Sequence, residues 1–180
     1  MNTNDVLEQR RSIRKFKPGS ITKDQIEELV HASQMAPSWK NSQTPRYYVA
    51  TTEEGMNKMR AGLPQRNADH TINAVAMFVL TFKKDVAGFM KNGSPDNEAG
   101  NGWGFYDTGL ASENLLLKAC DMGFGTILMG IRNEQVLREQ CQIPADEIIT
   151  SVIAMGVPDI HPTAPKRKEV SKIITYVDGE

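Results

Sequence analysis

One helical segment, residues 105–122, constrains the fold more than any other part of the sequence. Its apolar side chains are spread around the helix axis rather than gathered in one stripe, and they are Leu110, Ala111, Leu115, Leu116, Leu117 and Cys120. A helix that is apolar all round is typically buried among other elements. Gly123 stands where a left-handed residue commonly ends a helix. We therefore expect a central, buried helix that the other elements surround.

The other periodic segments predict a mixture of helices and strands. A capping box at Thr22–Gln25 predicts the start of an amphipathic helix that continues to about Met35. Residues 75–82 are a continuous apolar run of strand length, which is typical of a buried strand. Residues 46–51 and 148–156 are rich in β-branched or aromatic residues and are also predicted to be strands.

Shorter segments complete the prediction of a single layered domain. Asn4 is a candidate N-cap for a first helix, residues 53–62 are expected to be helical, and Asn133 can cap a helix that ends near Cys141. Residues 173–177 could form a short extended end. Because the helices outnumber the strands and do not alternate regularly with them, we expect one α+β domain spanning residues 1–180.

Charge and composition argue against several classes of function. The formal net charge is −1 and the pI is near 6.3, so we expect no nucleic-acid partner and no attraction to an anionic membrane. No apolar run approaches the roughly 20 residues that span a bilayer, and the N-terminus lacks the features of a signal peptide. Neither the histidines nor Cys120 and Cys141 have metal-ligand spacing. We expect a cytoplasmic protein with reduced thiols and no metal site.

A basic stretch near the N-terminus is the most distinctive polar feature. Arg10, Arg11 and Arg14 lie close together, with Ser12 between them. Arginine suits the bidentate recognition of phosphate or carboxylate, because its donors form a rigid fork and its charge is permanent. If residues 6–14 are helical, Arg10 and Arg14 share one face. The alternative is a solvated basic helix end that complements the helix dipole.

Together with three later stretches, this basic stretch resembles the nitroreductase family of flavin-mononucleotide (FMN) enzymes. The later stretches are Ala36–Gln43, Asp107–Leu115 and Gly123–Thr126 running on to Gly130. The resemblance implies a nitroreductase-like α+β fold with a central, mostly antiparallel sheet flanked by helices. It further implies a homodimer with its sites at the subunit interface, FMN as the cofactor, and NADH or NADPH as the electron donor.

The resemblance assigns two basic clusters to the phosphate and ribityl chain of FMN. One cluster is Arg10, Arg11, Ser12 and Arg14, and the other is Lys166, Arg167 and Lys168. It also implies that the cation of Arg14 lies near the N1/O2 edge of the ring, where positive charge stabilises the anionic reduced flavin. The alternative for the C-terminal cluster is a solvated charge run, and which of its three cations contacts phosphate is left open.

Residues from two further segments are implied beside the flavin ring. Leu128, Met129 and Gly130 match a family segment that packs on one ring face and offers a backbone amide to N5, although Leu128 and Met129 alone would be interpreted as core residues. Asn67 and His70 match a family pair of Asn and Lys near the polar edge of the ring. Because His70 departs from that Lys, it is more simply a surface histidine.

A polar loop and three aromatic residues complete the expected site. The loop residues Pro37, Ser38, Asn41 and Gln43 match a family loop that reaches the flavin of the partner subunit, although Ser and Asn also favour an ordinary turn. The substrate pocket is expected to include Trp39, Trp103 and Phe105, with packing on the loop or in the core as the alternative. Residues 85–104 are glycine-rich and polar, and we expect them to form a mobile lid over the substrate.

These residues together predict an oxidoreductase whose chemistry is carried by the cofactor and not by a catalytic side chain. Hydride would pass from NAD(P)H through flavin N5 to an electron-poor small molecule such as a nitroaromatic or a quinone, with ping-pong kinetics. Two other interpretations are open. The protein could store or sense flavin without useful turnover, or it could be a basic-patch binding module with no flavin.

Overall fold

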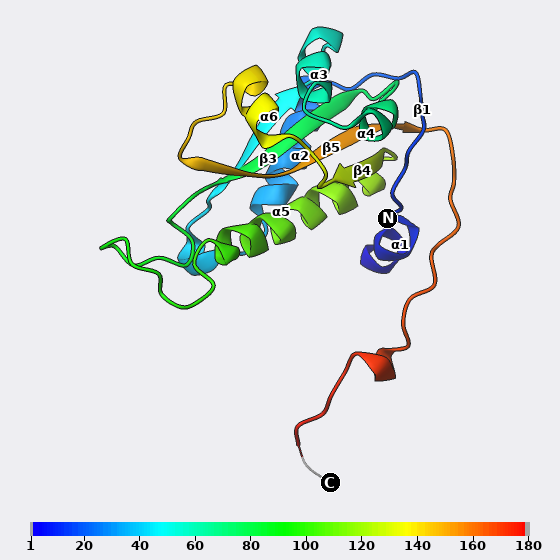
Figure 1. The fold of residues 1–180 in the computed structure, drawn as a ribbon. Helices are drawn as coiled ribbons and strands as arrows, with labels where there is room; N and C mark the ends of the chain where they lie inside the picture. The colour runs from blue at the N-terminus through cyan, green and yellow to red at the C-terminus, as the bar shows by residue number, and fades with distance from the viewer. Residues whose placement is uncertain (1, 179–180) are drawn as a thin grey trace.

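The computed structural model describes residues 2–178, which fold around a five-stranded sheet (Figure 1). The strands are β1 (Phe16–Lys17), β2 (Pro45–Ala50), β3 (Ala76–Lys83), β4 (Gly125–Met129) and β5 (Glu147–Pro158). Their order is β1-β5-β3-β2, β4 also pairs with β5, and each of these pairings is antiparallel. The expected α+β fold with a mostly antiparallel sheet is confirmed.

Local side-chain caps begin two of the helices where the sequence predicts them. The helices are α1 (Thr3–Gln9), α2 (Lys23–Gln34), α3 (Glu53–Arg60), α4 (Gln65–Asp69), α5 (Gly102–Asp121) and α6 (Glu134–Cys141), with 3-10 turns η1 (Trp39–Asn41) and η2 (Val170–Lys172). At the start of α2, the Thr22 hydroxyl accepts from Gln25 N at 3.2 Å and the Gln25 side chain accepts from Thr22 N at 2.9 Å. Asn133 caps α6 by accepting from Val136 N at 3.1 Å.

The first helix differs from the prediction at both ends. Its N-cap is Asn2, which forms a capping box with Asp5, so Asn4 is not the cap. The helix ends at Gln9, and the chain then runs extended, with Ile13 N donating to Thr126 O at 2.8 Å. The possibility that residues 6–14 form one helix was therefore wrong, because pairing with β4 draws the chain out.

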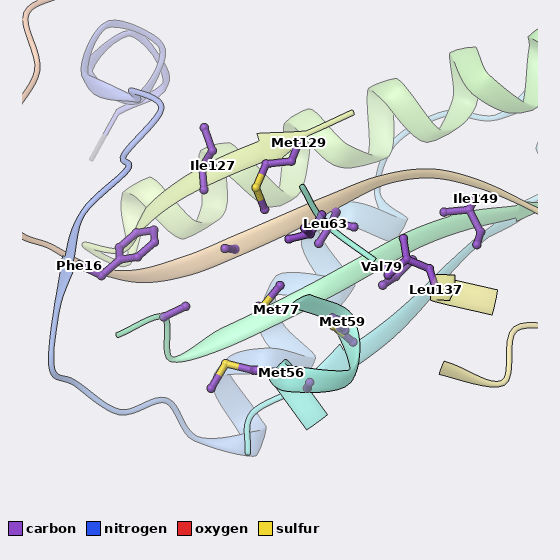
Figure 2. Packing of buried hydrophobic residues seen from close by; sticks show 14 of the residues in the cluster. Phe16, Met56, Met59, Leu63, Met77, Val79, Ile127, Met129, Leu137 and Ile149 are labelled. Atoms are coloured by element: carbon purple, nitrogen blue, oxygen red, sulfur yellow. The ribbon is translucent and has the colours of Figure 1, made fainter. Parts of the chain in front are cut away.

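Two apolar clusters cover the two faces of the sheet. Alternate residues of β3 point to opposite faces: Met77 and Val79 pack with residues of α3 and α6 (Figure 2), while Phe78 and Leu80 pack with residues of α2 and α5. Both faces of β3 are thus covered, which explains why its sequence is a continuous apolar run instead of an alternating one.

The long strand β5 contains one extra residue where it pairs with β3. Leu80 pairs with Ser151 and Thr81 pairs with Ile149, so Thr150 has no partner in the ladder. This arrangement is a β-bulge. The Thr150 hydroxyl donates to Leu80 O at 3.0 Å across the bulge. As a result, Ile149 joins the cluster that contains α3 and α6, whereas Ile153 joins the one that contains α2 and α5.

Helix α5 is buried against the sheet but is not covered on every side. Ala111, Leu115 and Ala119 are buried, whereas Phe105 is 49% exposed and Tyr106 is 60% exposed. Gly109 and Glu113 continue this exposed side along the helix. The expectation that this helix is buried on all sides is therefore wrong within a single chain, because the other elements of the chain cover only part of the helix surface.

The C-terminal segment leaves the body of the protein after β5 and extends away from it (Figure 1). Each described residue from 163 to 178 is exposed, including the apolar residues Ile173, Tyr176 and Val177. Residues 173–177 form no strand, so they do not join the sheet of their own chain. Among residues 2–178, no helix combines the length and apolar character that crossing a membrane requires.

A glycine in α5 gives a direct test of how tightly this helix packs on the sheet. Gly104 is buried, and a Cβ atom there would overlap the ring of Phe82. Gly104→Ala should lower the free energy of unfolding by about 1–3 kcal/mol, the usual cost of overpacking, as measured by urea denaturation. In the control Gly102→Ala, the new Cβ meets Ala99 at an ordinary 3.6 Å, and stability should not fall. Equal stability of the two variants would contradict the described packing.

A buried carboxylate links three strands by their side chains. Glu147 of β5 accepts from Thr81 Oγ1 of β3 at 2.5 Å and from Tyr48 OH of β2 at 2.9 Å, and Lys83 Nζ lies 3.1 Å from it. Burial acts to raise the pKa of Glu147, but the bonds from Thr81, Lys83 and Tyr48 outweigh it and lower the pKa. Burial and the bond to Glu147 raise the pKa of Tyr48 to about 12.

This carboxylate should make stability depend on acid pH. Because the folded-state pKa of Glu147 lies below its unfolded value, its contribution is full above the unfolded value and is lost as pH falls through the folded one. Glu147→Gln should lower the free energy of unfolding by about 1–3 kcal/mol at neutral pH and flatten its fall in acid. Urea denaturation from pH 7 to pH 3 measures both effects. The exposed control Glu98→Gln should change neither the free energy of unfolding at neutral pH nor its fall in acid. If stability falls in acid as steeply in Glu147→Gln as in the wild type, Glu147 does not cause the pH dependence.

Candidate functional site

The strand β4 presents an open apolar surface beside exposed backbone. Leu128 is 42% exposed, whereas its neighbours Ile127 and Met129 are buried in the core. Gly130 follows at the end of the strand and is exposed, and a Cβ atom there would meet nothing within 4 Å. A flat ligand can therefore approach Leu128 and the backbone of Gly130, while Met129 can contribute only main-chain atoms.

Two distant segments of the chain converge on the ends of β4. Ser12 forms a parallel bridge with Thr126 at one end. At the other end, Asn67 Nδ2 donates to Ile131 O at 3.1 Å. Three of the sequence-predicted groups, at Ser12, Asn67 and residues 128–130, are thus brought to one strand. His70 lies at the C-terminal end of α4, the helix that carries Asn67.

The N-terminal basic cluster lies beside this strand. Arg10 Nε is 3.6 Å from Glu113 Oε1 of α5, Arg11 Nη1 donates to Arg10 O at 2.7 Å, and Arg14 is exposed. Arg10 and Arg11 line a cavity of about 380 Å³ together with Cys120 and His161. The N-terminal stretch thus meets the segment that leads from β5 toward the second basic cluster. Lys166, Arg167 and Lys168 lie farther along in the exposed C-terminal segment.

The thiol in this cavity is held in its protonated form. Cys120 is half-buried, and burial raises its pKa, although the positive charges of Arg10 and Arg11 act in the opposite direction. Burial likewise raises the pKa of Cys141. Neither thiol is a candidate nucleophile, since the thiolate is the reactive form. Among residues 2–178, no group of three or more His, Cys, Asp or Glu side chains could hold a metal ion.

The loop of residues 37–43 is folded tightly at the start of α5. Ser38 Oγ accepts from Gln43 N at 3.0 Å, and the 3-10 turn η1 lies between these residues. Trp39 N donates to the buried Asp107 Oδ2 at 2.9 Å. Burial raises the pKa of Asp107, and the hydrogen bond from Trp39 opposes that rise. The Asn41 side chain is exposed, so it is free to contact another molecule.

Aromatic side chains gather beside this loop. The Trp39 and Trp103 ring centroids are 4.3 Å apart, and Trp103 also meets Tyr106 at 5.7 Å. Phe105 points elsewhere, because its ring packs edge-on against Phe82 at 5.1 Å. It lines a cavity of about 220 Å³ together with Leu128. The structure therefore divides the predicted pocket residues, with the two tryptophans at the loop and Phe105 beside β4.

The segment of residues 85–101 is tied to its surroundings at several points. Trp103 Nε1 donates to Asn97 Oδ1 at 2.9 Å, and Lys40 Nζ lies 2.7 Å from Asp96 Oδ2. Asp85 and Asn101 exchange hydrogen bonds of 2.8 Å that close the base of the segment. It contains no helix, and its contacts connect it with the loop of residues 37–43.

One chain does not bring the loop of residues 37–43 to the β4 surface. A cavity of about 670 Å³ is lined by the loop together with Asp107 and Ala111 of α5. The cavity beside Leu128 is lined by Thr108 and Ser112 of the same helix. The two groups thus lie against different faces of α5. Sequence analysis assigned no role to Asp107, although this residue opens the stretch Asp107–Leu115, one of those that carry the family resemblance.

Comparisons with known proteins agree on one family. The model of the Nitroreductase family matches residues 7–157. A protein of Archaeoglobus fulgidus, provisionally named as an NADH dehydrogenase/NAD(P)H nitroreductase, is 29% identical over 153 residues, which cover 83% of this chain and 81% of the relative.

Solved structures share the fold. A nitroreductase family protein of Clostridium difficile 630 has a TM-score of 0.80 at 21% identity, covering 98% of this chain and 99% of the other. A BluB-like flavoprotein of the same organism has a TM-score of 0.79 at 21% identity, with the same two coverages.

Proposed function

Since this chain belongs to the nitroreductase family, we propose that it is a homodimeric, FMN-dependent oxidoreductase that takes electrons from NADH or NADPH. The family and the names of its relatives support an oxidoreductase. The observation that carries the finer proposal is the convergence of Ser12 and Asn67 on the two ends of β4, on either side of the exposed Leu128. A structural neighbour named as a flavoprotein supports flavin as the ligand.

The residues around β4 fit FMN in charge and shape. A phosphate dianion needs cations and hydrogen-bond donors, which Arg10, Arg11 and Ser12 supply beside the strand. A flat ring needs an apolar surface and close access to the backbone, which Leu128 and Gly130 supply. Arg14 is exposed and keeps its guanidinium available for the ring edge. The C-terminal cations are proposed to complete the phosphate site.

When bound, FMN would supply the redox chemistry, because N5 can accept hydride from NAD(P)H and pass it to an electron-poor acceptor such as a nitroaromatic or a quinone. The residues of this chain would bind and orient the ring and keep its acceptor-facing side accessible. Because the electron donor and the acceptor would occupy the same site beside the flavin one after the other, the kinetics would be ping-pong. Trp39 and Trp103 offer flat aromatic faces that suit flat acceptors. The segment of residues 85–101 would lie beside the opening through which an acceptor reaches the flavin.

The proposed dimer completes a site that one chain leaves open. The loop of residues 37–43 lies against a different face of α5 from the β4 surface, so the loop would act on the flavin of the partner subunit. The exposed Phe105 and Tyr106 of α5, and the exposed apolar residues of the C-terminal segment, supply apolar surface for subunit contact.

The visible absorption spectrum of the purified protein tests the proposal. A flavin spectrum that is bleached by NADH or NADPH and restored by a quinone or nitroaromatic is the expected result. A retained flavin that neither cofactor reduces would favour a flavin store or sensor. A colourless protein that binds no added FMN would overturn the proposal and leave the basic-patch module.

Loss of an arginine from the phosphate site should weaken flavin binding. Arg10→Ala removes a charge-assisted contact, so the binding free energy of FMN should weaken by about 2 kcal/mol. This corresponds to a roughly thirtyfold rise in the dissociation constant. Titration of the apoprotein by flavin fluorescence measures it. Lys23→Ala is the matched control, because Lys23 is an exposed cation that pairs with Glu27 of α2 at 3.4 Å. The affinity of this variant for FMN should match the wild type. An unchanged affinity in Arg10→Ala would remove this residue from the phosphate site.

Mixing two defective variants tests whether each site is built from two subunits. Arg10→Ala and Asn41→Ala alter residues that the proposal places at one flavin but on different chains. Dimers that combine one subunit of each variant should contain one intact site, so denaturing and refolding the variants together should restore part of the lost activity. Refolding each variant alone is the control. No recovery in verified mixed dimers would show that both residues act within one chain.

A further inference from the structure

Three non-glycine residues in the loop of residues 37–43 have a left-handed backbone conformation. Lys40, Asn41 and Gln43 have φ values of 47°, 55° and 48°, in the left-handed region that non-glycine residues seldom occupy. Hydrogen bonds inside the loop, such as Asn41 N to Ser38 O at 2.9 Å, shape its turn. They would survive if the loop moved as a unit, so its position must depend on contacts with other elements.

A buried carboxylate of α5 provides such a contact. Asp107 is 3% exposed, and its Oδ2 accepts from Trp39 N at 2.9 Å. The first residue of η1 is Trp39, and Ser38 before it makes no side-chain cap to the turn. Asp107 therefore caps this turn from outside, through a charge-assisted bond to its first N–H. Among residues 2–178, no Lys or Arg forms an ion pair with Asp107, so no cation competes with Trp39 N for its carboxylate oxygens.

We propose that Asp107 is a positioning residue, which fixes the loop of residues 37–43 where it can meet the flavin of the partner subunit. The inference rests on the proposed function for the role of the loop, but the positioning itself rests on the contact with Trp39. Moving the Trp39 backbone would move Ser38 and Asn41 with it. Other attachments of the loop involve exposed cations: Lys40, whose side chain is 64% exposed, pairs with Asp96, and Arg46 Nη1 donates to Gln43 O at 2.9 Å. Solvent competes for both more strongly.

The tryptophans make the position of the loop directly measurable. The chain has two, Trp39 and Trp103, and their ring centroids are 4.3 Å apart at this contact. Trp39 Nε1 is buried and has no hydrogen-bond partner. Release of the loop would expose the Trp39 indole to water and shift the emission to longer wavelength. It would also make the bond after the exposed Lys40 a better substrate for trypsin.

The test compares three variants of the full-length protein. Asp107→Leu removes the acceptor at similar size, and Asp107→Asn keeps an oxygen acceptor. Thr108→Val alters the next buried residue of α5, whose hydroxyl donates to Gly104 O at 2.7 Å. Asp107→Leu should red-shift the tryptophan emission and speed tryptic cleavage after Lys40 about tenfold. Asp107→Asn should stay within about twofold of wild type, and Thr108→Val should show neither change.

Unchanged emission and cleavage in Asp107→Leu would overturn the proposal. So would equal acceleration in Asp107→Asn or in Thr108→Val, because the cause would then be something other than the lost acceptor. The dissociation rate of FMN tests the link to the site and should rise about tenfold in Asp107→Leu. A released loop with an unchanged flavin rate would overturn that link. If the wild type binds no flavin, the proposed function fails, while emission and cleavage still decide the positioning.

Discussion

The pairing of β5 with three other strands is the constraint on which the rest of the structure depends. β5 pairs with β3 along most of its length, with β4 through residues 152–156, and with β1 at residues 157 and 158. Because β4 is held by this pairing, its alternation is fixed, and Leu128 must face outward when Ile127 and Met129 face the core. The candidate ligand surface is therefore a consequence of the same hydrogen-bond ladder that holds the sheet together.

Helix α5 gives the site its division into two parts. One face of the helix meets the loop of residues 37–43 through Asp107, and another meets the cavity beside Leu128. In a single chain, the loop and the surface beside Leu128 thus face different directions. The helix also carries the large exposed side chains of Phe105 and Tyr106, on the side that the elements of its own chain leave uncovered. Subunit contact, as proposed, would give both features one explanation.

Elements governed by local interactions were predictable from the sequence, and those governed by distant ones were not. The capping box of α2 and the apolar run of β3 act within a few residues, so the sequence contains their whole signal. The end of α1 at Gln9 depends instead on Thr126 O, more than a hundred residues away. For the candidate site, Ser12 and Asn67 lie beside β4, and their contact with a flavin stays a prediction of the resemblance. The exposure of Leu128 and the separation of Trp103 from Phe105 required knowledge of tertiary packing.

The β-bulge in β5 has a consequence for the lengths of chain that this fold accepts. In a regular strand, removing one residue turns all side chains beyond it to the opposite face. Thr150 is an exception, because it is the extra residue of the bulge. Ser151 and Ile149 pair with the consecutive residues Leu80 and Thr81, so they already face opposite sides of the sheet. Position 150 is thus a place in β5 where a one-residue deletion would keep each neighbour on its present face. Elsewhere in the strand, a change of length by one residue would move the side chains beyond it from one apolar cluster to the other.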